Sequence, residues 1–87
     1  MMNQEEAQRQ ISDVQTRYGD MLMQLPNVVG IGIGYKTTSG EMTDQLALVV
    51  MVEKKIPLDE LEPQQRIPAH IEGVTVDVQE TGAFFAQ

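Results

Sequence analysis

Residues 28–36 read VVGIGIGYK, and this stretch decides how the chain folds. Large apolar side chains alternate with glycine at every second position, which is the period of a β-strand. One face of the strand is therefore bulky, while Gly30, Gly32 and Gly34 leave bare backbone on the other. Glycine weakens a strand and marks a place where another group comes close. We predict that a helix packs against this glycine face.

The glycines allow two interpretations other than helix packing: phosphate binding, and close approach of another ligand or chain. The dinucleotide fingerprint G-x-G-x-x-G lies in the turn between a strand and a helix. Here the glycines lie inside the strand and a polar stretch follows, so phosphate binding is disfavoured. Close approach of another ligand or chain stays open as the alternative to helix packing.

The segment before the strand has the pattern of an amphipathic helix. Apolar residues recur in steps of three and four from Ala7 through Ile11 and Val14, and charged residues occupy the other face. Pro26 disfavours helical geometry in the residue before it. We therefore predict a helix over about residues 4–25.

Two further strands are expected after the glycine strand. Residues 46–54 (LALVVMVEK) are apolar at both parities, which is typical of a central strand covered on both faces. Residues 74–80 (VTVDVQE) alternate and predict a strand with one polar face. The polar residues 37–44 predict a hairpin loop of several residues, and Pro57, Pro63 and Pro68 make residues 56–73 an irregular crossover.

The expected fold is a single α+β domain over residues 1–87. Its N-terminal helix packs on a small, mostly antiparallel three-stranded sheet. One helix cannot cover both faces of that sheet. The opposite face must therefore contact the crossover, the tail or another copy of the chain, and we select Val49 and Met51 in the central strand and Phe84 and Phe85 in the tail as candidate interaction residues.

The chain offers little for catalysis. His70 is the only histidine, and no second histidine or paired carboxylate near it in sequence would orient its ring. There is no cysteine, neither Ser12 nor Ser39 lies in a nucleophile motif, and the acidic residues 59–62 lack the spacing of a calcium loop. We predict no catalytic centre, cofactor or metal site, and hence a protein that is not an enzyme.

Charge and hydropathy exclude further classes. Thirteen acidic and six basic residues give a formal net charge of −7, which disfavours nucleic acid and anionic lipid surfaces as partners. The longest apolar run, residues 46–52, is far shorter than the roughly 18 residues that span a bilayer. The absence of a leader pattern in the first thirty residues leads us to expect a cytoplasmic protein.

Residues 25–82 resemble a bacterial domain family. The similarity lies in LPNVVGIGIGYK, LALVVMVEKKIP and IPAHIEGVTVDVQETG. It points to the small uncharacterised accessory domain that precedes the catalytic domain of some bacterial trypsin-like serine peptidases, here free-standing. The peptidase motifs themselves, GDSGG and a TAAH-like histidine segment, are missing, so the resemblance implies an accessory module and gives no catalytic residue.

The expected function is a non-enzymatic accessory or protein-interaction module that associates with itself or with another chain, and the resemblance implies that a peptidase is such a chain. The alternative is a small-molecule binding domain whose cleft is formed by the glycine strand and the crossover.

Overall fold

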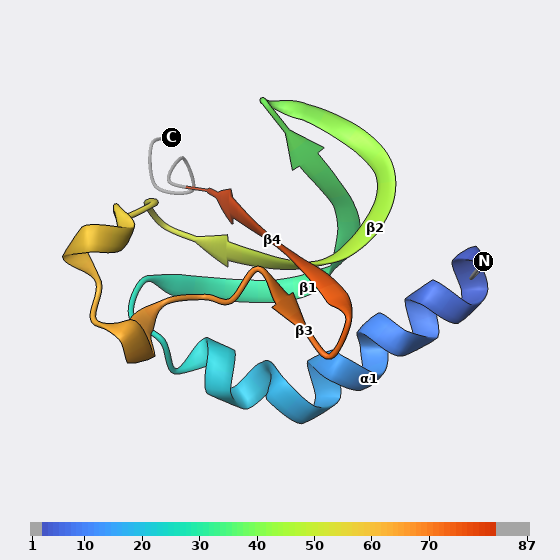
Figure 1. Cartoon of the computed structure of the whole chain (residues 1–87), viewed down its shortest axis with the longest axis horizontal. Helices are drawn as coiled ribbons and strands as arrows, with labels where there is room; N and C mark the ends of the chain where they lie inside the picture. The colour runs from blue at the N-terminus through green and yellow to red at the C-terminus, as the bar shows by residue number, and fades with distance from the viewer. Residues whose placement is uncertain (1–2, 82–87) are drawn as a thin grey trace.

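The computed structural model describes residues 3–81 and shows one helix against a curved sheet (Figure 1). In chain order the elements are α1 (Gln4–Met23), β1 (Val28–Thr38), β2 (Glu41–Val52), the 3₁₀ turns η1 (Leu58–Glu60) and η2 (Pro63–Gln65), β3 (His70–Ile71) and β4 (Val74–Glu80). The α+β class predicted from the sequence is confirmed.

The helix begins and ends close to the predicted residues. The side chain of Asn3 caps it by accepting from the backbone N–H of Glu6 at 2.8 Å, which satisfies one of the unpaired donors of the first turn. The helix ends at Met23, two residues earlier than predicted. Its buried stripe includes Ile11, Val14 and Leu22.

The sheet has four strands in the order β1-β2-β4-β3, so the prediction of three strands is wrong. β1 and β2 pair antiparallel, as do β3 and β4, but β2 and β4 pair parallel. Parallel neighbours need a connection of a dozen or more residues. The proline-rich crossover supplies it, with η1 and η2 in place of an α-helix.

The fourth strand, β3, lies within residues 56–73, which the sequence predicts to be an irregular crossover. It is two residues long and meets β4 across a tight turn at Glu72 and Gly73, whose φ angles are 49° and 83°. Two successive positive φ values are typical of a type I′ hairpin turn. The strand escaped sequence analysis because two residues are too few to show a period.

The β1–β2 hairpin is longer than predicted. In place of a loop over residues 37–44, the strands continue to a two-residue turn at Ser39 and Gly40, with φ of 52° and 82°. Ser-Gly with both residues at positive φ again matches a type I′ turn, whose twist suits the flanking strands. Outside this turn, the polar residues of the predicted loop are strand residues, some exposed and some, such as Thr37 and Thr43, half-buried.

Helix α1 packs on the bulky face of β1, so the predicted contact with the glycine face is wrong. Ile31 and Ile33 lie against the core that the helix helps to form. The glycine that permits close packing is in the helix: a Cβ at Gly19 would lie 3.0 Å from Cδ1 of Ile31.

The opposite face of the sheet is partly covered by the chain itself. The far end of the β1–β2 hairpin bends over this face, away from α1 (Figure 1), and its Thr37 bonds to Asp77 of β4. Glycine inside a strand is often found at such tight bends. Val49, which points into this face, is 7% exposed, so the central strand is buried on both sides as its sequence indicated.

Candidate functional site

A carboxylate on β4 holds the bent end of the hairpin. The Oδ2 atom of Asp77 accepts from the N–H of Thr37 at 2.9 Å, from its hydroxyl at 3.1 Å, and from Nε2 of Gln79 at 3.0 Å. Burial alone would raise the pKa of Asp77, but the hydrogen bonds from Gln79 and Thr37 and the charge of Lys36 outweigh burial and hold that pKa below its ordinary value. Asp77 is therefore ionised at neutral pH and fixes one end of β1.

The middle of β1 presents unpaired backbone at the margin of the sheet. The carbonyl of Val52 in β2 accepts from the N–H of Thr81 at 2.8 Å, on the β4 side. The N–H and C=O groups of successive residues point to alternate sides of a strand. Those of Val50 and Leu48 therefore point toward β4, as the carbonyl of Val52 does. These two residues are paired with Ile31 and Ile33 of β1. The N–H and C=O groups of Ile31 and Ile33 therefore point away from β2, to an edge that no strand of the described chain covers.

The side chains along this edge are sparse. Gly32 lies between Ile31 and Ile33 in the chain and belongs to the opposite face of the sheet, over which the hairpin bends. A Cβ added at Gly32 would meet no atom within 4 Å. Val29 and Tyr35, on either side of that segment, are 40% and 36% exposed. We define Val29, Ile31, Gly32, Ile33 and Tyr35 as the β1 edge.

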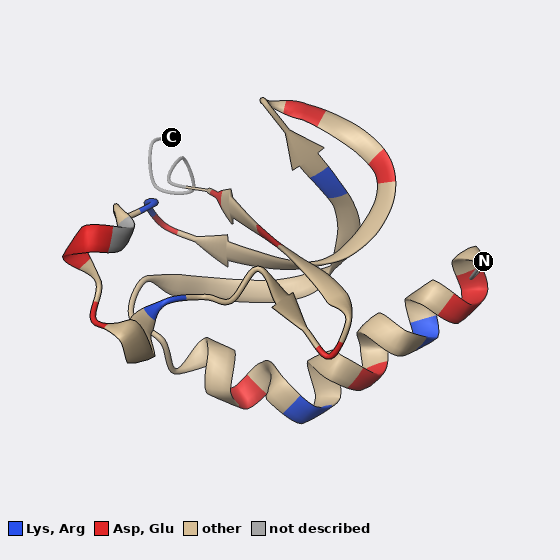
Figure 2. Cartoon of the chain, viewed as in Figure 1, with Lys and Arg blue, Asp and Glu red and all other residues tan. Residues whose placement is uncertain are grey.

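The β1 edge is also the least acidic part of the fold. Every other helix or strand longer than three residues contains at least one Asp or Glu, whereas β1 contains none and has one lysine, Lys36 (Figure 2). In a chain of net charge −7, this strand is the element that an acidic partner approaches with least repulsion.

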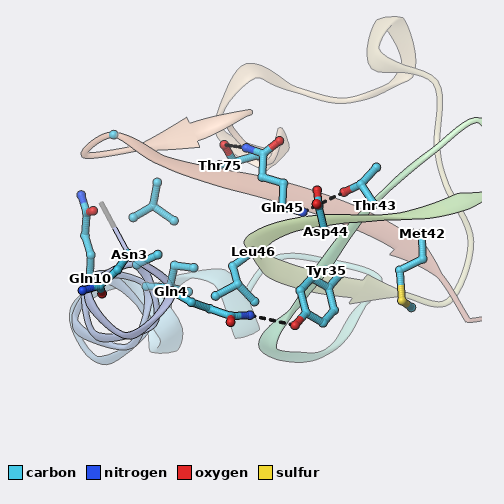
Figure 3. Close-up of a pocket in the computed structure, with 14 residues that line it drawn as sticks. Asn3, Gln4, Gln10, Tyr35, Met42, Thr43, Asp44, Gln45, Leu46 and Thr75 are labelled. Carbon is cyan, nitrogen blue, oxygen red and sulfur yellow. Dashed lines mark hydrogen bonds between the residues drawn. The ribbon is translucent and has the colours of Figure 1, made fainter. Parts of the chain in front are cut away.

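A second candidate site is a concave surface between the first half of α1 and the β1–β2 hairpin (Figure 3). This amide groove has a volume of about 960 Å³. Half of its fourteen lining residues have amide or hydroxyl side chains, and the apolar part of the lining includes Leu46. The labelled polar residues in the view are Asn3, Gln4, Gln10, Tyr35, Thr43, Asp44, Gln45 and Thr75. The groove can donate and accept hydrogen bonds, and Asp44 is its only charged side chain among the described lining residues.

Two hydrogen bonds order the walls of the amide groove. Nε2 of Gln4 donates to the hydroxyl of Tyr35 at 2.8 Å and so joins α1 to β1. Nε2 of Gln45 donates to the hydroxyl of Thr75 at 3.1 Å and joins β2 to β4. The groove is thus held by side chains from four elements.

A third contact fixes the helix to the turn between β3 and β4. Glu72 accepts from the hydroxyl of Tyr18 at 2.5 Å and pairs with the Arg17 guanidinium at 2.5 Å. The hydrogen bonds from Tyr18 and Arg17 lower the pKa of Glu72. This contact sets the position of α1 and hence of the groove beside it.

The residues selected from the sequence are dispersed. Gly30 and Gly34 lie close to side chains of the neighbouring strand: a Cβ would come within 3.0 Å of Met51 and 3.2 Å of Val49, respectively. Val49 is buried and Met51 half-buried, and Phe84 and Phe85 lie outside the described residues. Of these, only Gly32 belongs to the β1 edge.

His70 is exposed on β3, where it pairs with Thr75. Across residues 3–81, no group of three or more His, Asp or Glu side chains is arranged to hold a metal ion. Nor does that part of the chain include a helix whose length and hydropathy would let it cross a lipid bilayer.

Neither Asp77 nor the amide groove is evident from the sequence. The alternation of residues 74–80 assigns Asp77 to the polar face of its strand, and only the bend of the hairpin, which no local pattern reports, buries it. The edge position of β1 depends on strand order, which the sequence did not give. The glycine alternation is the local pattern that singles out this strand, because glycine inside a strand often marks a bend or a close approach.

A comparison with protein families matches residues 14–79 to the NARROW LEAF 1 N-terminal domain. The match runs from the second half of α1 to β4 and includes the sheet and the crossover. The chain belongs to the NARROW LEAF 1 N-terminal domain family. No curated protein matches the chain. The family match contains all of the β1 edge but only part of the amide groove, since Asn3, Gln4 and Gln10 precede residue 14.

Proposed function

We propose that this chain is a non-enzymatic accessory module that binds another protein chain by strand addition at the β1 edge. The observation that carries the proposal is the outward direction of the backbone groups of Ile31 and Ile33. An extended segment that adds to such an edge gains main-chain hydrogen bonds, and its alternate side chains give specificity.

The surroundings of the edge support this function. Proteins protect edge strands by charge, proline, bulges or covering elements, because an open edge pairs with other chains. β1 has irregular pairing near both ends, and Asp77 holds its far end, yet its centre has neither proline nor charge. The features that protect an edge strand are therefore found at the ends of β1 and are lacking around Gly32.

An accessory role next to a peptidase is a subsidiary proposal. Its support is the resemblance of residues 25–82 to the domain ahead of trypsin-like catalytic domains, together with the name of the family, which denotes an N-terminal domain. We expect the purified chain to change the activity or the refolding yield of a peptidase encoded alongside it. Unchanged activity and yield would remove the peptidase as the partner.

The main proposal is tested by native mass spectrometry on the chain purified gently from its source. Wild type is compared with Gly32→Asp, which places a carboxylate on the β1 edge where a side chain has room. Gln64→Asp, in the exposed crossover, is the matched control. We expect wild type and Gln64→Asp to retain a second protein chain that Gly32→Asp loses. Equal retention by all three, or a bare 9.7 kDa mass for wild type, would contradict the proposal.

The amide groove favours a second candidate function, the binding of a small uncharged polar ligand. Its support is the density of amide and hydroxyl groups around an apolar lining, which is the composition of many ligand sites. A thermal-shift panel of neutral sugars and dipeptides with blocked, uncharged termini tests it, with Gln45→Ala as the groove variant and Gln64→Ala as the control. A shift that Gln45→Ala abolishes and Gln64→Ala keeps supports the candidate; no shift with any probe counts against it.

A further inference from the structure

The β1 edge is nearly symmetric about Gly32. Counting outward from Gly32, Ile31 mirrors Ile33, Gly30 mirrors Gly34, and Val29 mirrors Tyr35. When two copies of one strand pair antiparallel about a two-fold axis, each residue meets its mirror position. Large residues would then face large ones, and glycine would face glycine.

From this symmetry we propose that a second copy of the chain adds to the β1 edge, antiparallel, with the two-fold axis at Gly32. The inference rests on the proposed function and names its partner. A two-fold contact of this kind is isologous, because the same surface of both copies pairs with itself and leaves neither β1 edge open.

The backbone satisfies the hydrogen-bonding pattern of such a pair. Residues whose N–H and C=O groups point toward each other exchange two hydrogen bonds in an antiparallel ladder. Ile31 of one copy would face Ile33 of the other and exchange both bonds, and the symmetry repeats the exchange on the other side of the axis. Gly32 then meets Gly32 in the intervening pair, whose Cα atoms lie about 4.5 Å apart.

The side chains fit the same axis. Val29 and Tyr35 are the two exposed large apolar residues of β1. They occupy mirror positions in the sequence about Gly32, with Val29 at the register shift between Val28 and Gly30. Cross-strand pairs of an aromatic and a β-branched residue are favourable. Each copy would thus cover apolar surface that the single chain leaves in water.

Charge points to the same contact. Two copies that each have a net charge of −7 repel one another through most of their surface. β1 has no carboxylate, so edge-to-edge approach brings together the strand of each copy that contributes no acidic side chain (Figure 2). Continuous pairing would make one sheet of eight strands from two sheets of four.

A cross-linking experiment tests the axis directly, because the chain has no cysteine of its own. Gly32→Cys would place the two thiols on the axis, where the Cα separation of about 4.5 Å falls within the disulfide range of about 4.4–6.8 Å. Gln64→Cys, in the exposed crossover, is the control for random collision. With oxidised glutathione as oxidant, we expect Gly32→Cys to form a disulfide dimer at least tenfold faster than the control.

Sedimentation of the recombinant chain supplies the second readout. We expect wild type to dimerise with rising concentration and Gly32→Asp to stay monomeric, because it would set two carboxylates against each other on the axis. Circular dichroism shows that each variant has folded. A monomeric wild type, or equal disulfide rates at residues 32 and 64, would overturn the inference.

The experiments distinguish failure of the proposed second copy from failure of strand addition at the β1 edge. If the recombinant chain is a monomer while material from the source holds a different protein that Gly32→Asp loses, the second copy is wrong and strand addition stands. If neither preparation holds a partner that depends on Gly32, both are wrong.

Discussion

Asp77 and Thr37 are forty residues apart in the chain, and two hydrogen bonds to one carboxylate oxygen join them. The contact brings the far end of the β1–β2 hairpin over the sheet and buries Asp77 to 9% exposure. It also uses backbone of β1 at Thr37, which confines the open part of the β1 edge to the residues before it.

We expect Asp77→Asn to destabilise the fold. Asparagine keeps the size of the side chain but presents an amide in place of one acceptor and removes the charge that strengthens these bonds. Hydrogen bonds to a charged group contribute about 1.5–3 kcal/mol, so the free energy of unfolding in urea should fall by about 1–3 kcal/mol. Asp59→Asn, on the exposed 3₁₀ turn η1, should leave it unchanged. A loss as large in Asp59→Asn would mean that net charge, and not the contact, is responsible.

Stability should fall in mild acid, and the sign follows from the two lowered pKa values. Asp77 and Glu72 have folded pKa values below their ordinary values of 3.8 and 4.5. Their stabilisation is complete above those ordinary values and is lost as pH falls through the lower, folded values. The urea midpoint should therefore hold from neutral pH to about pH 5 and then drop.

Two variants separate this effect from general acid denaturation. The difference in urea midpoint between wild type and Asp77→Asn should shrink as the pH falls below 3.8 and through the lower folded pKa of Asp77, because the side chain at residue 77 is then neutral in both proteins. Glu72→Gln should behave in the same way. A difference that stays constant down to pH 2 would show that neither carboxylate titrates with unfolding.

Local patterns predicted the elements with strong periods. The stripe of α1, the apolar run of β2 and the alternation of β4 all appear close to the residues expected. What failed depends on contacts distant in sequence. The β3 strand is too short for a period, and the parallel pairing of β2 with β4 is set by how the crossover returns.

The glycines show the same limit at the candidate site. Their alternation predicted a helix at the glycine face, whereas the side chain that lies near Gly30 is Met51 of the neighbouring strand, within 3.0 Å of where a Cβ of Gly30 would lie. It could not say from which side the helix comes. Two features decide that: the bulky face of β1 completes the core, and Gly19 lets α1 approach it. Because Gly32 alone of the three has open space, its role is visible only in the structure.

The contact between Gly19 and Ile31 should give a measurable coupling. Alanine in a helix is about 1 kcal/mol more favourable than glycine, but a Cβ at residue 19 would lie 3.0 Å from Cδ1 of Ile31. Gly19→Ala alone should therefore gain little. In an Ile31→Val background, which removes that Cδ1, it should stabilise by about 1 kcal/mol.

Urea denaturation of the four proteins closes this cycle. Ile31→Val alone is expected to cost about 0.5–1.5 kcal/mol. Additive effects would show that the side chain of Ile31 moves aside without cost, and that the tight contact does not limit the packing of α1.

Glycine at residue 32 should be unnecessary for folding, in contrast to Gly73. Gly73 has φ of 83° in the turn between β3 and β4, so Gly73→Ala should cost about 1–2 kcal/mol. Gly32 is extended and has room for a Cβ. Gly32→Ala should therefore raise the free energy of unfolding of the monomer by about 0.4–1 kcal/mol, because alanine restricts the unfolded chain.

The contrast between Gly32 and Gly73 bears on why β1 has no side chain at residue 32. A residue whose replacement by alanine stabilises the isolated chain is not kept as glycine by the fold, which leaves close approach from outside as its physical role. Thermal unfolding at low protein concentration, where any dimer is dissociated, measures the effect on the monomer alone. Destabilisation by Gly32→Ala under these conditions would instead assign Gly32 to the bend of the hairpin and would remove the main structural reason for placing a partner at the β1 edge.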